Sequence, residues 1–413
     1  KTGNGGAFTD GTDNLLGTTS NAPLNVIVNG ARAMRFEPNA TSPNVIGGFN
    51  GNNVTAGAVG GAIGGGGASA NLNRVTDNHG TIGGGINNQA GDNGGTVSDA
   101  AYATVGGGRD NAASQGDATV GGGRGNLASN YYATIGGGQL NAASGNSATV
   151  AGGVGNRSLE SHTMVGGGQN NTASEIYATV GGGRNNTASG SSATVGGGQL
   201  NAASGSYSTV GGGDKDTASG DYSTVSGGAN NTASGSRSTV GGGESNTASD
   251  DFSTVGGGQN NTASEIYSTV AGGRNNTASD NSSTVGGGQG NTASAFISTV
   301  SGGFINTASG NASTVSGGSH NRAIGDGSTV SGGASNIDSG EYSTIAGGTG
   351  LTFTATADRS FGFHANNSGG TRDMTISAPD VAVFGNTDLW LANNDGAASE
   401  LRFFEDYSGA GAF

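Results

Sequence analysis

The residue types that most often perform chemistry are scattered through this sequence of 413 residues. The four histidines are His79, His162, His320 and His364. No two of them have the spacing of a metal-ligand pair. No serine follows the strand–turn–helix pattern that presents a nucleophile to a His–Asp pair. The sequence therefore predicts no catalytic residue, and we expect a protein that is not an enzyme.

Two acidic groups, Asp250-Asp251 and Asp214-Lys215-Asp216, offer carboxylate oxygens of the kind that Ca²⁺ prefers, but no further ligand accompanies either group. The glycine-rich run 60–67 resembles a phosphate-binding loop, yet it lacks the following helix that would receive the phosphate. We expect no cofactor and no metal site.

Composition excludes several classes of protein. Glycine contributes 88 residues and proline only 4, with no three-residue period, which excludes collagen. There is no cysteine for a disulfide scaffold and no apolar run long enough to cross a membrane, so we expect no membrane insertion. With 15 basic residues and a net charge of −14, the sequence favours no nucleic-acid partner.

A repeat of 15 residues dominates the sequence. Valine or isoleucine recurs at 17 positions from Val105 to Ile345 without a single insertion. Disordered sequences do not hold such a phase, so each unit must fold as one structural element. Three less regular units precede the array, at Ile46, Ile63 and Ile82.

Two columns within the repeat predict bends of the chain. A glycine pair lies two and three residues after each valine, where positive φ or close backbone approach excludes a Cβ. Asparagine lies at the sixth position after nearly every valine; we expect it to adopt the left-handed region and its amides to form a ladder. The predicted structural corner residues include Gly107, Gly108, Asn111, Gly182, Gly183, Asn186, Gly257, Gly258 and Asn261.

Between the bends, Ser-Thr-Val and Thr-Ala-Ser alternate with a period of two, which is typical of strands. A unit of 15 residues is too short for a crossover helix. The sequence predicts an all-β fold: a parallel β-roll, or β-solenoid, with 15-residue turns of two strands and β-rich caps at both ends. The inward residues should be the valine, the Ala or Ser two positions before it and the Ala eight positions after it.

We divide the chain into four segments. Residues 1–44 contain a predicted hairpin around Asn29-Gly30 and form an N-terminal cap, and residues 45–100 form irregular turns with loop insertions. Residues 101–348 form the regular array, and residues 349–413 form a C-terminal β cap or adjoining β module. Further strands are expected over 381–384, 388–391 and 401–404, with a turn at 394–396.

A single coil with so small a core is expected to need either an unusually strong hydrogen-bond ladder or association with other chains. The segment Ala218-Ser219-Gly220-Asp221-Tyr222-Ser223-Thr224-Val225 resembles the head repeat of trimeric autotransporter adhesins. This resemblance covers residues 101–348 and implies a left-handed β-roll, an intertwined or side-by-side homotrimer, and attachment to surfaces. The period differs, since the repeat of that family is slightly shorter. Residues 386–393 resemble bacterial or phage-type tail fibres, which implies an endosialidase-type intramolecular chaperone beyond Phe413.

Two outward features are candidates for binding. An aromatic residue often lies three positions before the valine; candidate ligand or interchain contacts are Tyr177, Tyr207, Tyr222, Phe252 and Tyr267. Stacked aromatic rings would hold sugars, or they would cover a corner or an interchain seam. Threonine lies seven positions after the valine in nine units from Thr172 to Thr307, which suits an ice-binding face or close packing against another chain.

The function that we predict is that of a non-enzymatic extracellular fibrous protein, an adhesin or tail-fibre shaft at a cell surface or on a particle. Its expected partners are further copies of itself in a homotrimer and an unknown surface receptor or glycan. Many weak contacts along a stiff repeat would add through avidity. The alternatives are an ice- or mineral-surface-binding solenoid and a glycan-binding or glycan-degrading fibre.

Overall fold

The structure is a computed structural model that describes residues 17–18, 20–365 and 373–385. The chain divides into two compact units, Lys1–Tyr267 (unit 1) and Ser268–Phe413 (unit 2). All regular elements in the described part of both units are strands. The strands expected over 388–391 and 401–404, the turn at 394–396 and the segment 386–393 lie outside the described residues.

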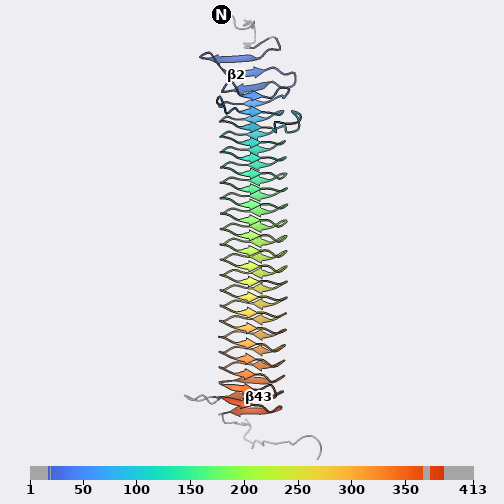
Figure 1. Ribbon diagram of the computed structural model, residues 1–413, viewed down its shortest axis with the longest axis vertical. Coiled ribbons are helices and arrows are strands. Elements are labelled where there is room, and N and C mark those ends of the chain that lie inside the picture. The colour runs from blue at the N-terminus through green and yellow to red at the C-terminus, as the bar shows by residue number, and fades with distance from the viewer. Residues whose placement is uncertain (1–16, 19, 366–372, 386–413) are drawn as a thin grey trace, which may run out of the picture. The chain divides into compact units, whose positions relative to one another are not determined.

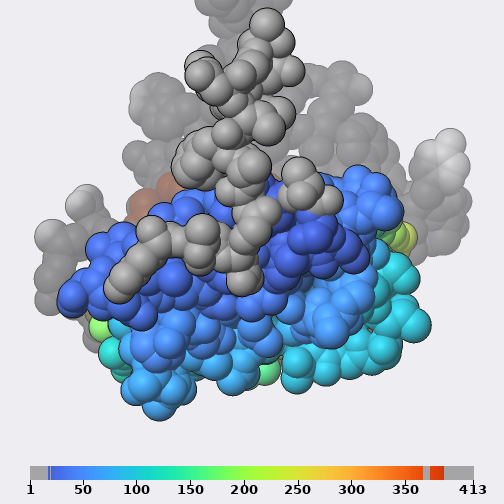
Figure 2. Space-filling view, turned by 90° about the horizontal axis from the view of Figure 1, so that it is seen from above, coloured from blue at the N-terminus to red at the C-terminus, as the bar shows by residue number. Residues whose placement is uncertain are grey.

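Unit 1 begins with an antiparallel hairpin of β1 (Leu24–Val28) and β2 (Ala31–Glu37). Asn29 and Gly30 form its turn with φ of 50° and 76°, values that suit these two residue types. β2 also pairs antiparallel with β3 (Asn44–Gly47), the first strand of the parallel stack. The hairpin therefore covers one edge of that stack, at the end of the unit that Figure 2 shows in blue.

After β3, each turn of unit 1 contributes one strand to each of two parallel sheets, which we call the valine sheet and the alanine sheet (Figure 1). The valine sheet continues through β5 (Ala62–Ile63), β7 (Thr81–Ile82), β9 (Thr104–Val105), β11 (Thr119–Val120), β13 (Thr134–Ile135), β15 (Thr149–Val150), β17 (Met164–Val165), β19 (Thr179–Val180), β21 (Thr194–Val195), β23 (Thr209–Val210), β25 (Thr224–Val225), β27 (Thr239–Val240) and β29 (Thr254–Val255). The alanine sheet contains β4 (Asn53–Val54), β6 (Arg74–Val75), β8 (Gln89–Ala90), β10 (Ala112–Ala113), β12 (Leu127–Ala128), β14 (Ala142–Ala143), β16 (Arg157–Ser158), β18 (Thr172–Ala173), β20 (Thr187–Ala188), β22 (Ala202–Ala203), β24 (Thr217–Ala218), β26 (Thr232–Ala233), β28 (Thr247–Ala248) and β30 (Thr262–Ala263).

Unit 2 repeats this arrangement. Its valine sheet contains β31 (Thr269–Val270), β33 (Thr284–Val285), β35 (Thr299–Val300), β37 (Thr314–Val315), β39 (Thr329–Val330), β41 (Thr344–Gly348), β43 (Phe361–His364) and β45 (Ala382–Gly385). Its alanine sheet contains β32 (Thr277–Ala278), β34 (Thr292–Ala293), β36 (Thr307–Ala308), β38 (Arg322–Ala323), β40 (Ile337–Asp338), β42 (Leu351–Phe353) and β44 (Met374–Ile376).

The register confirms the predicted length of the turn. Val105 pairs with Val120 and Val120 pairs with Ile135, both in parallel. The three irregular units obey the same rule, since Ile46 pairs with Ile63 and Ile63 with Ile82. The predicted all-β parallel solenoid is therefore confirmed, with longer corners where the spacing exceeds that of the regular repeat.

The core of each turn is small and fully enclosed by one chain. In a representative turn, Val105, Ala103 and Ala113 each have 0% exposure, as the inward set predicted. Thr104 and Ala112 point outward and are half-buried. A single chain thus buries the valine column by itself; the homotrimer stays a prediction.

Two features of the coil were not expected from the sequence. A third parallel bridge in each regular turn joins the residues four positions after the valines, for example Arg109 with Arg124. In unit 2 the parallel stacking also continues past residue 350, because β42 pairs with β40 and β43 pairs with β41. The loss of the sequence repeat after Gly350 therefore does not end the coil.

Candidate functional site

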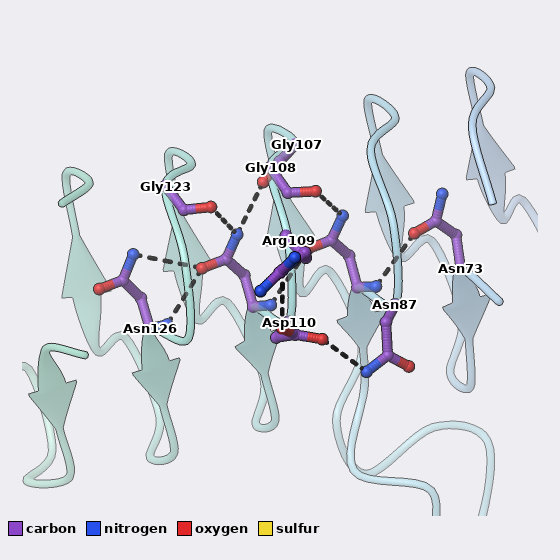
Figure 3. Close-up of polar contacts among 10 residues, drawn as sticks. Asn73, Asn87, Gly107, Gly108, Arg109, Asp110, Gly123 and Asn126 are labelled. Atoms are coloured by element: carbon purple, nitrogen blue, oxygen red, sulfur yellow. Dashed lines mark hydrogen bonds and ion pairs between the residues drawn. The ribbon is translucent and has the colours of Figure 1, made fainter. Parts of the chain in front are cut away.

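The first bend of each turn is held by an asparagine ladder (Figure 3). The Asn111 side-chain amide donates to the carbonyl of Gly107 in its own turn and to that of Gly123 in the next, both at 2.9 Å. Its Oδ1 accepts from the backbone N–H of Asn126 at 3.0 Å. One buried side chain therefore closes its own bend and joins it to the next.

The structure places the other predicted corner asparagines in the same arrangement. The Asn186 amide donates to the carbonyls of Gly182 and Gly198 at 2.9 and 2.8 Å. Asn261 donates to the carbonyl of Gly257 at 2.9 Å. All three asparagines are at most 1% exposed, so this column belongs to the interior of the coil.

One expectation about the asparagines was wrong. Asn111 and Asn186 are not among the residues with positive φ; the residue before each of them is, with φ of 58° at Asp110 and 56° at Asn185. The asparagine type is required by its amide donors and acceptor, which must reach two turns at once. Exposed side chains fill the left-handed position, where Asp110 accepts from Asn87 at 2.8 Å (Figure 3).

The two glycines of each pair are not equivalent. Gly108, Gly183 and Gly258 have φ of 92°, 88° and 92°. A Cβ on Gly183 would overlap the carbonyl oxygen of Gly198 in the next turn. Gly182 has open space where its Cβ would point and is not among the positive-φ residues, whereas Gly107 and Gly257 have φ of 153° and 156°, a conformation that residues with a Cβ rarely adopt. Close approach between turns therefore demands glycine at the second position of the pair.

The second bend carries the aromatic residues in a conformation that suits glycine. The backbone N–H of Ala133 donates to the Asn130 carbonyl at 3.1 Å and closes a four-residue turn. Tyr132 is the third residue of this turn and has φ of 59°. A positive φ at that place normally selects Gly or Asn. Gly327 occupies the equivalent position in unit 2 with φ of 66°. A bulky residue in this region is strained by about 1–2 kcal/mol.

Four of the five predicted contact residues form one exposed column. Tyr207 stacks on Tyr222 with ring centroids 4.9 Å apart, and Phe252 stacks on Tyr267 at 4.9 Å. The Arg237 guanidinium lies between the pairs, with Cζ 5.4 Å from the Tyr222 centroid and 5.3 Å from that of Phe252. We call these five residues the aromatic column.

Tyr177 lies outside the aromatic column. Its ring stacks on His162, with centroids 5.1 Å apart, and Ser192 occupies the position between Tyr177 and Tyr207. Sequence reasoning missed both His162 and Arg237 because it followed aromatic side chains alone. Their place in the register of the repeat, three positions before Val165 and Val240, was the signal that could have found them.

The column has a defined binding chemistry. Its rings cover one another's faces, so their edges, the phenol hydroxyls and the guanidinium meet the solvent. Tyr207, Tyr222 and Tyr267 are 54%, 52% and 56% exposed. A sugar can stack on a ring face only at an end of the column, such as the face of Tyr207 that points toward Ser192. The arrangement suits an amphipathic partner that packs against ring edges and accepts hydrogen bonds.

Neither acidic group singled out in the sequence forms a cluster of three ligands. Asp214 lies 3.9 Å from the Lys215 ammonium, and Asp251 accepts from the backbone of Ser236 at 2.9 Å. Within the described residues, one cluster brings three carboxylates together, at Asp77, Asp92 and Asp99. No helix in the described part of the chain is long and apolar enough to cross a membrane.

Comparison with known proteins adds one finding. Residues 298–310, which include β35 and β36, match the family model described as the ubiquitous surface protein adhesin repeat. A search of curated proteins finds no significant match to this chain. Over this one turn the chain is similar to a surface adhesin repeat, and together with the β-solenoid this similarity points to an adhesin-like structural protein.

Proposed function

We propose that the chain is an extracellular, surface-exposed adhesin-like fibre and that the aromatic column is one of its attachment surfaces. The observation that carries this proposal is the column itself. The aromatic residues of the column, such as Tyr222, have positive φ at a repeat position that Gly327 occupies in another turn, so glycine also fits there. Their rings are exposed. Strained backbone positions cluster at binding sites, and this supports the exposed aromatic column as a candidate attachment surface.

The geometry also supports avidity. Stacked centroids 4.9 Å apart put one side chain on each turn, at the spacing of parallel strands. A partner that lies along the coil would meet several ring edges and one guanidinium at regular intervals. Weak single contacts then add, which is the mechanism expected of a repeat adhesin.

A variant in which Tyr207, Tyr222, Phe252 and Tyr267 are all replaced by Ser tests the column. Serine occupies the same register at Ser192, with φ of 57°, so the variant is expected to fold. Beads coated with the full chain are applied to a panel of glycans and extracellular-matrix proteins. We expect the variant to lose most of its binding.

The matched control replaces Leu140 and Leu200, which are exposed apolar residues at the left-handed position of the other bend, by Ser. Serine also occurs there, at Ser245. Binding that survives in the column variant, or that the Leu140 and Leu200 variant loses equally, would contradict the assignment.

We also propose that the fibre is a homotrimer, with exposed apolar side chains such as Tyr177 and Ile176 available for interchain contacts. Light scattering of the full chain is expected to give three times the chain mass of 39.4 kDa. A stable monomer at micromolar concentration would overturn the trimer and leave the binding test of the column unaffected.

A second candidate function, binding to ice or mineral, is favoured by the threonine columns. On the alanine sheet Thr217 pairs with Thr232 and Thr232 with Thr247 in parallel register, and all three are half-buried and face outward. An ordered hydroxyl array of this kind would match a regular surface. Thermal hysteresis of the full chain checks the ice-binding candidate, and its absence at millimolar concentration would remove it.

A further inference from the structure

An insertion in unit 1 brings three carboxylates together. The spacing from Ile82 to Val105 exceeds that of the regular repeat, and the extra length forms a loop after β8 that contains Asp92 and Asp99. Asp77 lies in the preceding turn, after β6. One carboxylate oxygen from each of these three residues lies within 4.8 Å of the other two.

The loop uses one oxygen of each carboxylate for its own backbone. Asp77 Oδ2 accepts from the backbone N–H of Asp92 at 3.1 Å and from the Thr76 hydroxyl at 2.9 Å. Asp92 Oδ1 accepts from the N–H of Gly94 at 2.8 Å, and Asp99 Oδ2 from that of Thr96 at 3.2 Å. The second oxygen of each carboxylate is left for another ligand.

Asp77 provides the independent sign that a ligand belongs there. This residue is only 1% exposed, and its Oδ1 is buried with no hydrogen-bond partner in the described structure. A buried carboxylate oxygen without a donor is strongly unfavourable unless a cation or a proton satisfies it. Burial raises the pKa of Asp77, and the hydrogen bonds that Oδ2 accepts from Thr76 and Asp92 offset this effect only in part.

The separation of the oxygens is compatible with Ca²⁺. Ligand oxygens lie about 2.3–2.6 Å from this ion, so any two of them are at most about 5 Å apart. Mg²⁺ draws its ligands to about 2.0–2.1 Å in a strict octahedron and keeps most of its water. Exposure rises from buried Asp77 through half-buried Asp92 to exposed Asp99, which leaves an entry path from solvent.

We propose that Asp77, Asp92 and Asp99 bind one Ca²⁺ ion. Backbone carbonyls and water complete its shell of six to eight oxygens. The ion fastens the inserted loop to the turn that carries Asp77, since two of its ligands come from the loop and one from the coil. It neutralises three carboxylates that otherwise repel one another next to a buried oxygen.

Titration of CaCl₂ into the chelator-stripped full chain, followed by calorimetry, tests the site. We expect one Ca²⁺ per chain with a dissociation constant of about 10⁻⁴–10⁻³ M, the range of extracellular modules, and weaker binding of Mg²⁺. Asp92→Asn and Asp99→Asn should each weaken binding at least tenfold. The paired variant Asp250→Asn with Asp251→Asn, at an acidic pair outside the cluster, should leave it unchanged.

Limited proteolysis of the 91–100 loop gives a second readout. At Ca²⁺ ten times its dissociation constant, cleavage of the wild-type loop should slow about tenfold relative to chelator, because binding shifts the open population by that factor. Asp99 is exposed, so Asp99→Asn is expected to fold and to lose this protection. Asp77→Asn should resist cleavage better than the wild type in chelator and gain nothing from Ca²⁺.

Three results would overturn the proposal: no Ca²⁺ binding at concentrations well above the millimolar range, binding that persists in both Asp92→Asn and Asp99→Asn, or equal loop cleavage with Ca²⁺ and with chelator in the wild type. If Asp77→Asn stabilises the chain and Ca²⁺ has no effect on the wild type, the buried oxygen of Asp77 is satisfied by a proton and not by a cation. None of these outcomes depends on the aromatic column.

Discussion

Asn111 Oδ1 accepts a hydrogen bond from the backbone N–H of Asn126, one turn further along, at 3.0 Å. The same relationship joins Asn171 to Asn186 and Asn186 to Asn201, each at 2.9 Å. Each turn has only two short strands, so this buried ladder contributes hydrogen bonds between turns that the strands do not supply. It meets the need for a strong ladder that the small core creates.

Replacing Asn186 by Ala should lower the free energy of unfolding by about 2–4 kcal/mol, because two carbonyls and one N–H lose their buried partners. Urea unfolding followed by circular dichroism measures the change. Arg184→Ala, two residues away on the exposed side of the bend, should stay within about 0.5 kcal/mol of the wild type. Equal effects of the two substitutions would refute a ladder role for Asn186.

Alanine at the two glycines of one pair should have unequal effects. Gly183→Ala introduces a Cβ at φ of 88° against the Gly198 carbonyl and should reduce stability by at least about 2 kcal/mol. Gly182→Ala has open space and should change stability by less than about 1 kcal/mol. Thermal unfolding of the two variants makes the comparison, and a reversed order would contradict the assignment of close approach to Gly183.

Asp216 interrupts the ladder and should be a weak point at neutral pH. It replaces asparagine, its Oδ2 is buried without a partner, and burial raises its pKa. Because the pKa of Asp216 is higher in the folded chain than in the unfolded chain, the contribution of Asp216 to stability is full below pH 3.8. This contribution is lost as the pH rises through the pKa of the folded chain. Asp216→Asn restores an amide donor and should stabilise the chain by about 1–3 kcal/mol at pH 7.

Unfolding measured at pH 4 and pH 8 checks this expectation. The gain from Asp216→Asn should be larger at pH 8, because the wild-type carboxylate is then charged. The exposed substitution Asp221→Asn serves as the control for removal of one negative charge. A gain that is the same at both pH values would mean that Asp216 does not titrate with folding.

Asp338 should make unit 2 less stable at neutral pH than in acidic solution. It occupies a buried alanine position of the alanine sheet, and burial raises its pKa to about 7 despite hydrogen bonds from the Ser343 hydroxyl and the Gly340 amide. Its contribution to stability is full below pH 3.8 and falls by about 1.4 kcal/mol per pH unit between there and pH 7, above which no further loss occurs.

The thermal midpoint between pH 3 and 9 measures this loss. Asp338→Ala copies Ala323 of the preceding turn and should flatten the pH dependence. Glu341→Gln, at a nearby exposed residue, should keep the wild-type profile. A difference between wild type and Asp338→Ala that stays constant from pH 4 to pH 7 would show that Asp338 has an ordinary pKa in the folded chain.

The site was only partly predictable from the sequence. The register located Tyr207, Tyr222, Phe252 and Tyr267, because side chains at the same place in successive turns must stack. Arg237 was missed although the same register contains it, since a cation between aromatic rings becomes evident only when the rings are seen on both sides of it. The meeting of Asp77 with Asp92 and Asp99 depends on how the inserted loop folds back, which no period encodes.

By itself, the sequence determined the architecture, because a valine at constant spacing with glycine at fixed offsets leaves a stacked parallel coil as the consistent solution. It also determined the inward set of Val105, Ala103 and Ala113. The tertiary structure alone decided that Asn111 points inward and spans two turns and that Gly183, but not Gly182, needs to be glycine. The physical reason is that these roles depend on contacts with the next turn, and such contacts exist only once the coil is closed.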